Sequence, residues 1–227
     1  MEYAEQMLDL LIQSYDEEVP LCKKMDAEMI ERLSNDNSEE IRAWLARALA
    51  YHNSDTQAIA LLCKLSQDTD SSVRVEAVDS LSGFATQDSF DMLCQASEDE
   101  DELVRAYAAF GIAYIGRKLY PERAMQTLMN MAQTEKSERV FVDIFEGLYI
   151  LGKNEMLEKL IELYHSTDYQ VQCATLNVLD ELVYPQNVST IYKFVSIQDT
   201  SACVPAVACA LDRLAQRCQA ILDEQPN

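Results

Sequence analysis

VRVEAVDSL, the stretch that runs from Val73 to Leu81, decides how this chain folds. Its residues Val73, Ala77 and Leu81 are four positions apart and therefore lie on one face of an α-helix. The chain as a whole is rich in Ala, Leu, Glu, Gln and Met, which favour helices, and has only five Gly and five Pro among 227 residues. No strand-like alternating run stands out, so the sequence predicts an all-α fold.

The same stretch returns, with changes, along most of the chain. Aligned on its first residue, the copies follow one another at steps of 32, 31, 36, 31 and 32 residues and begin at Ile41, Val73, Val104, Val140, Val171 and Cys203. The next position is Arg in the first three copies, as Arg42, Arg74 and Arg105. Five residues before the first four copies stands an acidic residue: Asp36, Asp68, Asp99 or Glu135. Positions 0, 4, 7 and 8 share one helical face, which predicts a buried stripe in each copy.

A second helical segment precedes each copy, so each unit is expected to be a helix, a short turn and a helix. These upstream segments are Pro20–Leu33, Asp55–Ser66, Asp88–Ser97, Pro121–Ala132, Asn154–His165 and Asn187–Ile197. Neither helix can bury its apolar stripe alone, so neighbouring units are expected to stack around one core. We therefore predict one domain over 1–227, with a capping helix in 1–19 and a polar tail at 217–227. The six repeats are predicted at 20–53, 54–85, 86–117, 118–152, 153–184 and 185–216.

These motifs resemble the HEAT repeat, in the short form common in bacterial HEAT-like proteins. The best match is the stretch 73–81 with its turn residue Asp68, and the resemblance covers about residues 20–216. It implies a right-handed α-solenoid, a superhelix of about six HEAT-like helical hairpins, with an Asp–Arg ladder from repeat to repeat. The ladder is predicted to be interrupted after residue 134, where the Arg is replaced by Phe141, Gln172 and Val204.

The formal net charge is −21 at pH 7, which disfavours binding to nucleic acid or to an anionic membrane. A charge of this size speeds the encounter with a partner of opposite sign, so a protein partner with a basic surface is favoured, although solubility alone is the simpler interpretation. The sequence has no apolar run long enough to predict a membrane span, and its acidic N-terminus is unlike a signal peptide, so a cytoplasmic location is expected.

The seven Cys are expected to be reduced, mostly as core residues such as Cys63, Cys94, Cys173 and Cys209.

The sequence shows no motif for catalysis, a metal ion or a cofactor, and we expect none. His52 and His165 are far apart, neither is part of the His-Glu pairs of HEAT-like iron hydroxylases, and no Cys-x-x-Cys spacing occurs. HEAT-like DNA glycosylases use a basic concave face, whereas this chain is acidic. Nothing in the sequence indicates the bilin of HEAT-like lyases. An enzyme of either kind is therefore the least favoured function.

The resemblance places the second helix of each repeat on the concave side of the solenoid. Positions 3, 6 and 10 of these helices lie beside the buried stripe, so their side chains are candidates for binding a partner. They alternate between aromatic and acidic clusters and are Trp44, Arg47, Tyr51, Glu76, Asp79, Tyr107, Phe110, Tyr114, Asp143 and Glu146. Aromatic groups supply interface energy and carboxylates orient a basic partner. The alternative is that the aromatics pack between repeats, with Trp44 against residues 25–30.

These residues predict a non-enzymatic protein-binding solenoid that grips a basic protein. One concrete form is an immunity protein or inhibitor that neutralises a toxin by charge complementarity. The alternative is a general scaffold or assembly adaptor, which could dock through its other helices. Neighbouring genes would discriminate between the two, since a toxin-like reading frame is expected beside an immunity protein and unrelated pathway genes beside an adaptor.

Three local features carry further expectations. The 36-residue step predicts an insertion that lengthens the loop near 117–121, where Arg117, Lys118 and Arg123 would form a solvated basic spot. Gly111 is expected to permit a close helix approach. Pro205 follows the start of the last copy and is compatible with a first helical turn.

Overall fold

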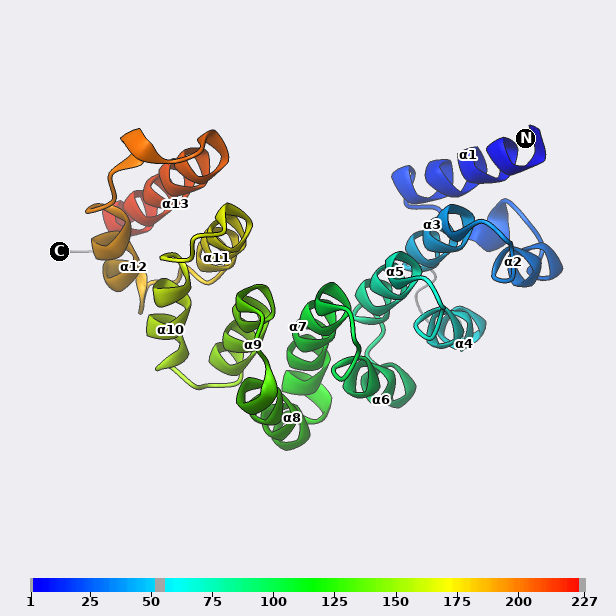
Figure 1. Cartoon of the computed structure of the whole chain (residues 1–227), viewed down its shortest axis with the longest axis horizontal. Helices are drawn as coiled ribbons and strands as arrows, with labels where there is room; N and C mark the ends of the chain where they lie inside the picture. The colour runs from blue at the N-terminus through cyan, green and yellow to red at the C-terminus, as the bar shows by residue number, and fades with distance from the viewer. Residues whose placement is uncertain (1, 52–55, 225–227) are drawn as a thin grey trace. The chain divides into compact units, whose positions relative to one another are not determined.

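Helices form all the regular structure in residues 2–51 and 56–224, the parts that the computed structural model describes (Figure 1). These ranges contain thirteen α-helices, two short 3-10 helices and no strand, which confirms the predicted all-α class. Packing divides the chain into two compact units, Met1–Thr134 and Glu135–Asn227, which we call the N-terminal and C-terminal units.

The N-terminal unit consists of two layers of helices. Its helices are α1 (Glu2–Asp16), α2 (Ala27–Leu33), α3 (Glu39–Leu49), α4 (Thr56–Leu65), α5 (Ser71–Leu81), α6 (Gln87–Ala96), α7 (Glu102–Leu119) and α8 (Pro121–Thr134). Helices α1, α3, α5 and α7 pack side by side in that order and form what we call the second-helix layer. The first helix of each hairpin lies behind this layer, and α4 packs there against α6. The N-terminal helix thus covers α3, as expected for a cap.

The C-terminal unit repeats this arrangement with α9 (Glu138–Ile150), α10 (Met156–Leu163), α11 (Tyr169–Glu181), α12 (Val188–Val195) and α13 (Pro205–Glu224). Helix α11 packs between α9 and α13, while α10 and α12 pack against their following helices. The last helix begins at Pro205, as the sequence predicts, but it differs from the expected polar tail. It continues past residue 217 to Glu224, because Cys218 is fully buried in the core of this unit and holds the additional turns.

The cysteines are free, as expected, but they are less buried than the sequence suggests. Cys63, Cys94 and Cys173 are half-buried, and Cys218 is the buried one. Cys209 is exposed, so its predicted core position is wrong. It precedes the buried Ala210 and Leu211 on α13 and faces away from them.

The turn between the two helices of a hairpin is closed by an aspartate. Asp36, Asp68 and Asp99 each accept a hydrogen bond from the backbone N–H two residues later, at 2.9 Å in all three turns. The residues that donate these bonds also cap the next helix, since Ser38, Asp70 and Asp101 accept from backbone N–H groups of its first turn. These three aspartates therefore stabilise the turn within each hairpin.

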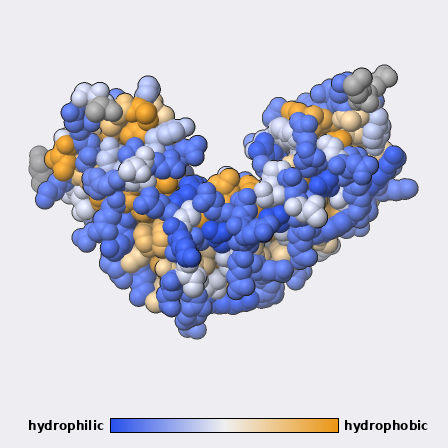
Figure 2. Space-filling model, viewed as in Figure 1, coloured by the Kyte–Doolittle hydropathy of each residue, from blue (hydrophilic) through white to orange (hydrophobic). Residues whose placement is uncertain are grey.

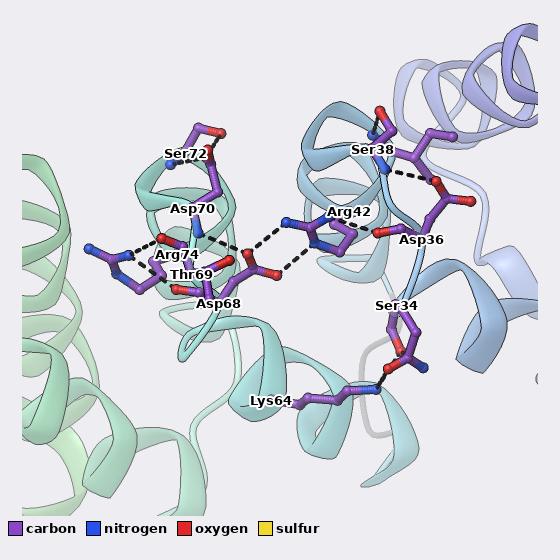
Figure 3. Close-up of polar contacts among 12 residues, drawn as sticks. Ser34, Asp36, Ser38, Arg42, Lys64, Asp68, Thr69, Asp70, Ser72 and Arg74 are labelled. Atoms are coloured by element: carbon purple, nitrogen blue, oxygen red, sulfur yellow. Dashed lines mark hydrogen bonds and ion pairs between the residues drawn. The ribbon is translucent and has the colours of Figure 1, made fainter.

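Asp68 and Asp99 also link one repeat to the next through the predicted Asp–Arg ladder, and Figure 3 shows its Arg42–Asp68 pair. Arg42 donates from Nε and Nη2 to Asp68 at 2.7 and 2.8 Å, and Arg74 donates in the same way to Asp99 at 2.9 and 2.8 Å. Each guanidinium also donates to a carbonyl of its own turn. The hydrogen bond from Arg42 lowers the pKa of Asp68, which outweighs the opposing effect of its partial burial. Such two-pronged pairs fix both distance and orientation between neighbouring helices.

The turn between α10 and α11 in the C-terminal unit uses uncharged groups at the equivalent positions, as the loss of Arg predicts. Gln172 occupies the Arg position and donates to the backbone O of Ser166 at 2.9 Å. Ser166 occupies the turn-aspartate position, and its hydroxyl accepts from the N–H of Asp168 and donates to Glu138 of α9. The turn is therefore preserved while the Arg–Asp pair is lost.

The 36-residue step has a different structural basis from the expected loop. Helix α7 continues for 18 residues to Leu119, and α8 begins at Pro121 directly afterwards. The inserted residues therefore extend a helix. Gly111 and Gly116 of α7 permit the close packing behind it: a Cβ on Gly111 would lie 2.9 Å from Leu93, and one on Gly116 would overlap Ala124 of α8. The expected role of Gly111 is confirmed.

Replacing Gly116 with Ala is expected to lower the free energy of unfolding by about 1–3 kcal/mol, because the added methyl group would force α7 and α8 apart. Gly83→Ala is the matched control, since its added Cβ would approach nothing closer than the Ser80 carbonyl at 3.4 Å. Chemical denaturation of both variants measures the effect. Equal stability of the two variants would contradict the close approach of α7 and α8.

Candidate protein-binding face

Two neighbouring hollows lie on the second-helix layer of the N-terminal unit. The large hollow has a volume of about 410 Å³ and is lined by residues of α1, α3, α5 and α7 and their ends: Tyr15, Arg47, Ala50, Tyr51, Val75, Glu76, Asp79, Ser80, Ser82, Gly83 and Tyr107. The small hollow has a volume of about 230 Å³ and is lined by Glu39, Glu40, Ala43, Trp44, Arg47, Ser72 and Glu76. The view in Figure 2 shows a mostly hydrophilic surface with hydrophobic side chains gathered over α1. Six of the ten predicted binding residues line one of these hollows.

Arg47 and Glu76 form the wall that the two hollows share. Arg47 donates from Nε and Nη2 to the two carboxylate oxygens of Glu76, each at 2.5 Å. Its guanidinium also lies over the Trp44 ring, 4.9 Å from the centroid. The hydrogen bonds to Glu76 raise the pKa of Arg47. This wall joins α3 to α5 and leaves both charges of the pair neutralised.

Tyr15 of α1 organises the aromatic side of this face. Its ring lies 6.0 Å from Trp44 in an edge-on arrangement and 5.5 Å from Tyr51. The sequence places Tyr15 on the apolar face of the N-terminal helix and so indicates only a role in the cap. Tyr15 lies in the last turn of that helix, and the next repeat carries the aromatic residues Trp44 and Tyr51. This proximity is the sequence signal that could have added Tyr15 to the predicted site.

Asp79 lines the large hollow and is an exposed residue. The surrounding walls still remove part of its hydration, and this desolvation, with the nearby charge of Glu76, raises the pKa of Asp79 despite the opposing charge of Arg47. Within the described parts of the chain, the carboxylate of Asp79 forms neither a hydrogen bond nor an ion pair. Asp79 thus provides a negative charge that Arg47, already held by Glu76, does not neutralise.

Phe110 and Tyr114 are on α7 but line neither hollow. Their rings stack at 6.0 Å, and Tyr114 is 42% exposed. Arg117 and Lys118 lie over the Tyr114 ring, at 4.8 and 5.6 Å from its centroid. The predicted solvated basic loop is therefore the last helical turn of α7, where cation–π contacts hold both side chains. Arg123 is separate from them and pairs with Asp91.

Asp143 and Glu146 belong to α9 of the C-terminal unit and are buried, with only 8% and 4% of their surface exposed. Arg139 forms an ion pair with Asp143. Desolvation raises the pKa of Asp143 to about 6 and that of Glu146 to about 8, and the charges of Asp143 and Glu181 add to the second shift. Neither carboxylate is displayed in the way that its helical position predicts.

The described residues contain no group of three potential metal ligands. Within them, His165 is exposed and contacts the Tyr164 ring edge-on, while His52 lies outside the described ranges. In the same parts of the chain no helix is long and apolar enough to cross a membrane. The linings of the two hollows contain tyrosine rings, hydroxyl groups and carboxylates.

Comparison with known proteins agrees with this architecture. A family model described as HEAT repeats matches residues 27–102 and 90–179. No curated protein sequence matches the chain. Among solved structures, YibA of Escherichia coli is 17% identical, with a TM-score of 0.57 over 92% of this chain and 77% of that one. The complex of CpcE and CpcF of phycocyanin lyase from Nostoc is 13% identical, with a TM-score of 0.47 over 85% and 95% of the chains. An archaeal HEAT-like repeats protein from Thermococcus onnurineus is 12% identical, with a TM-score of 0.38 over 87% and 98%.

Proposed function

Since this chain belongs to the HEAT-repeat family, we propose that it is a non-enzymatic protein-binding solenoid, which binds a partner with a basic surface through the second-helix layer of its N-terminal unit. The observation that carries the proposal is the large hollow, which is lined by Tyr15, Tyr51 and Tyr107 together with the unpaired carboxylate of Asp79. Amphipathic aromatic side chains and a carboxylate that needs a counter-charge suit a basic protein surface.

The charge of the whole chain supports the same kind of partner. A net charge of −21 accelerates the encounter with a basic protein and opposes binding to nucleic acids and anionic membranes. This long-range attraction distinguishes partners only by the sign of their charge. The hollow beside the Arg47–Glu76 wall adds the local complementarity that a specific complex requires.

In its more specific form, the proposal is an immunity protein or inhibitor that acts in the cytoplasm and covers the basic surface of a toxin. The alternative is a general adaptor that assembles other proteins, and it is favoured by the exposed Met129 on α8 and Ile197 after α12, which offer further apolar contacts. A DNA glycosylase or lyase activity has less support, because the displayed aromatic residues lie among carboxylates.

Exchanging both Trp44 and Tyr107 for Ala is expected to weaken capture of a basic partner at least about thirtyfold, because buried interface aromatics contribute about 2 kcal/mol or more. The measurement is affinity capture from the source cells, followed by binding of each captured basic protein in purified form. Met129→Ala is the control, since this residue is 40% exposed on α8, behind the second-helix layer.

Rising salt should slow association of the partner with the unaltered protein, since screened charges no longer steer the encounter. Thermal unfolding of the double variant separates lost binding from lost folding. A folded double variant that binds the basic partner as tightly as the Met129→Ala control would place the binding surface elsewhere.

A further inference from the structure

We infer that the large hollow binds the side chain of a single arginine or lysine from the partner, with Asp79 as its counter-ion. This inference rests on the proposed function and specifies which group of the partner enters the hollow. The hollow is within the usual range for ligand sites, of about 300–1,000 Å³, at about 410 Å³. It therefore has room for one long side chain and the atoms beside it.

The charges around the hollow select a cation. Both oxygens of Glu76 already accept from Arg47, so the charges of these two side chains largely compensate each other. Asp79 is the remaining charged residue in the lining, and its carboxylate faces a space that the protein leaves without a positive partner. An anionic ligand would meet this charge directly, and a neutral one would desolvate it without compensation.

The walls of the hollow select the shape of that cation. Tyr15 and Tyr51 are adjacent rings from α1 and the end of α3, and Tyr107 comes from α7 on the far side of α5. Electron-rich ring faces attract the charged end of Arg or Lys, and the apolar parts of the rings cover its aliphatic stem. Ala50, Val75 and Gly83 also line the hollow, and their small side chains leave room in it for the incoming side chain.

A metal ion fits this site poorly. Ca²⁺ and Mg²⁺ require several oxygen ligands in a defined shell, and among the described residues no cluster of three carboxylate, His or Cys side chains exists. One accessible carboxylate among tyrosine rings instead matches an organic cation, which needs one counter-charge and extended contact with its stem.

Three short, end-blocked peptides test the inference: Gly-Ser-X-Ser-Gly with X as arginine, lysine or the neutral arginine analogue citrulline. Each is titrated to about 10 mM into the full chain, a range suited to single-side-chain affinities. The readout is the amide NMR spectrum, which includes the one indole N–H signal of the chain, from Trp44. The indole ring lies 6.0 Å from Tyr15 in the wall of the hollow. Saturable shifts are expected for at least one cationic peptide, with binding about tenfold weaker for citrulline.

Asp79→Asn should weaken binding of the cationic peptide by about tenfold, because it removes the counter-charge while keeping the side-chain size. Glu28→Gln is the matched control: it removes the same charge from an exposed position of α2, outside both hollows, and should leave the affinity unchanged. The arginine and lysine arms identify which cation fits better. No saturable shift with either cationic peptide, equal binding of citrulline, or equal affinity of the two variants would overturn the inference.

The two proposals fail in distinguishable ways. If the peptides do not bind but capture of the basic partner still depends on Trp44 and Tyr107, the face binds proteins without a cation in the hollow. If the peptides bind through Asp79 and capture is unaffected by the aromatic exchanges, the hollow recognises a cation that does not come from that partner.

Discussion

Replacing Arg74 with Ala is expected to lower the free energy of unfolding by about 3 kcal/mol, the cost typical of removing one partner of a buried ion pair. The side chains of Arg74 and Asp99 are only 9% and 15% exposed. The exchange removes the two guanidinium bonds to Asp99 and the donor to the carbonyls of Asp68 and Thr69. Both losses fall on the contact between two hairpins. Chemical denaturation with urea measures the change.

Lys159→Ala is the appropriate control for Arg74→Ala. Lys159 pairs with Glu162 at 2.8 Å, but both side chains are at least half exposed. Exposed pairs of this kind contribute about 0–1 kcal/mol, since water and salt screen them. If Arg74→Ala were no more destabilising than Lys159→Ala, the ladder would be a consequence of stacking rather than a cause of its stability.

Arg74 also shows why much of the fold is predictable from the sequence. Stacked hairpins meet their neighbours in the same way each time, so the residues of a shared contact recur at the repeat spacing. Val73, Arg74 and Leu81 therefore mark the core and the ladder by their recurrence alone. The same comparison predicts the loss of the ladder at Gln172, because an amide cannot form a two-pronged pair with a carboxylate as Arg does.

Recurrence predicts less where the chain departs from the repeat. The 36-residue step shows that this repeat has additional residues, but it does not show which conformation they adopt. In the structure they belong to α7, which ends only at Leu119, just before Pro121 begins α8. The sequence does not indicate that Tyr15 is a binding residue, because α1 is not part of a complete repeat and cannot be aligned with the other copies. Its contacts with Trp44 and Tyr51 depend on how α1 packs on α3.

Exposure of the candidate site is also set by neighbours rather than by helical position. Asp79 and Glu146 both occupy position 6 of their repeats, yet Asp79 is exposed and Glu146 is 4% exposed. Helical periodicity places both beside the buried stripe, and only the three-dimensional packing decides which of them water can reach. The prediction of an exposed carboxylate at this position therefore holds for Asp79 in the large hollow but not for Glu146 on α9.

Glu146 provides a second prediction with a large effect, this time as a gain in stability. Its pKa is raised from 4.5 to about 8 by desolvation and by the charges of Asp143 and Glu181. The folded protein thus holds the Glu146 proton more tightly than the unfolded chain does. This contribution to stability is complete below about pH 4.5 and is lost progressively as pH rises towards 8, because a buried charge must then form.

Glu146→Gln keeps the size of the side chain but removes its titration. We expect the variant to be more stable than the unaltered protein by about 2–4 kcal/mol at pH 9, with little difference at pH 5. Asp143, whose pKa is raised to about 6, contributes a loss of the same sign at lower pH in both proteins and therefore cancels in the comparison. Urea denaturation across this pH range measures the difference, and Glu158→Gln on the exposed side of α10 is the control. A stability difference that did not grow with pH would mean that Glu146 ionises in the folded protein as readily as an exposed carboxylate, and that the core around α9 opens to admit water.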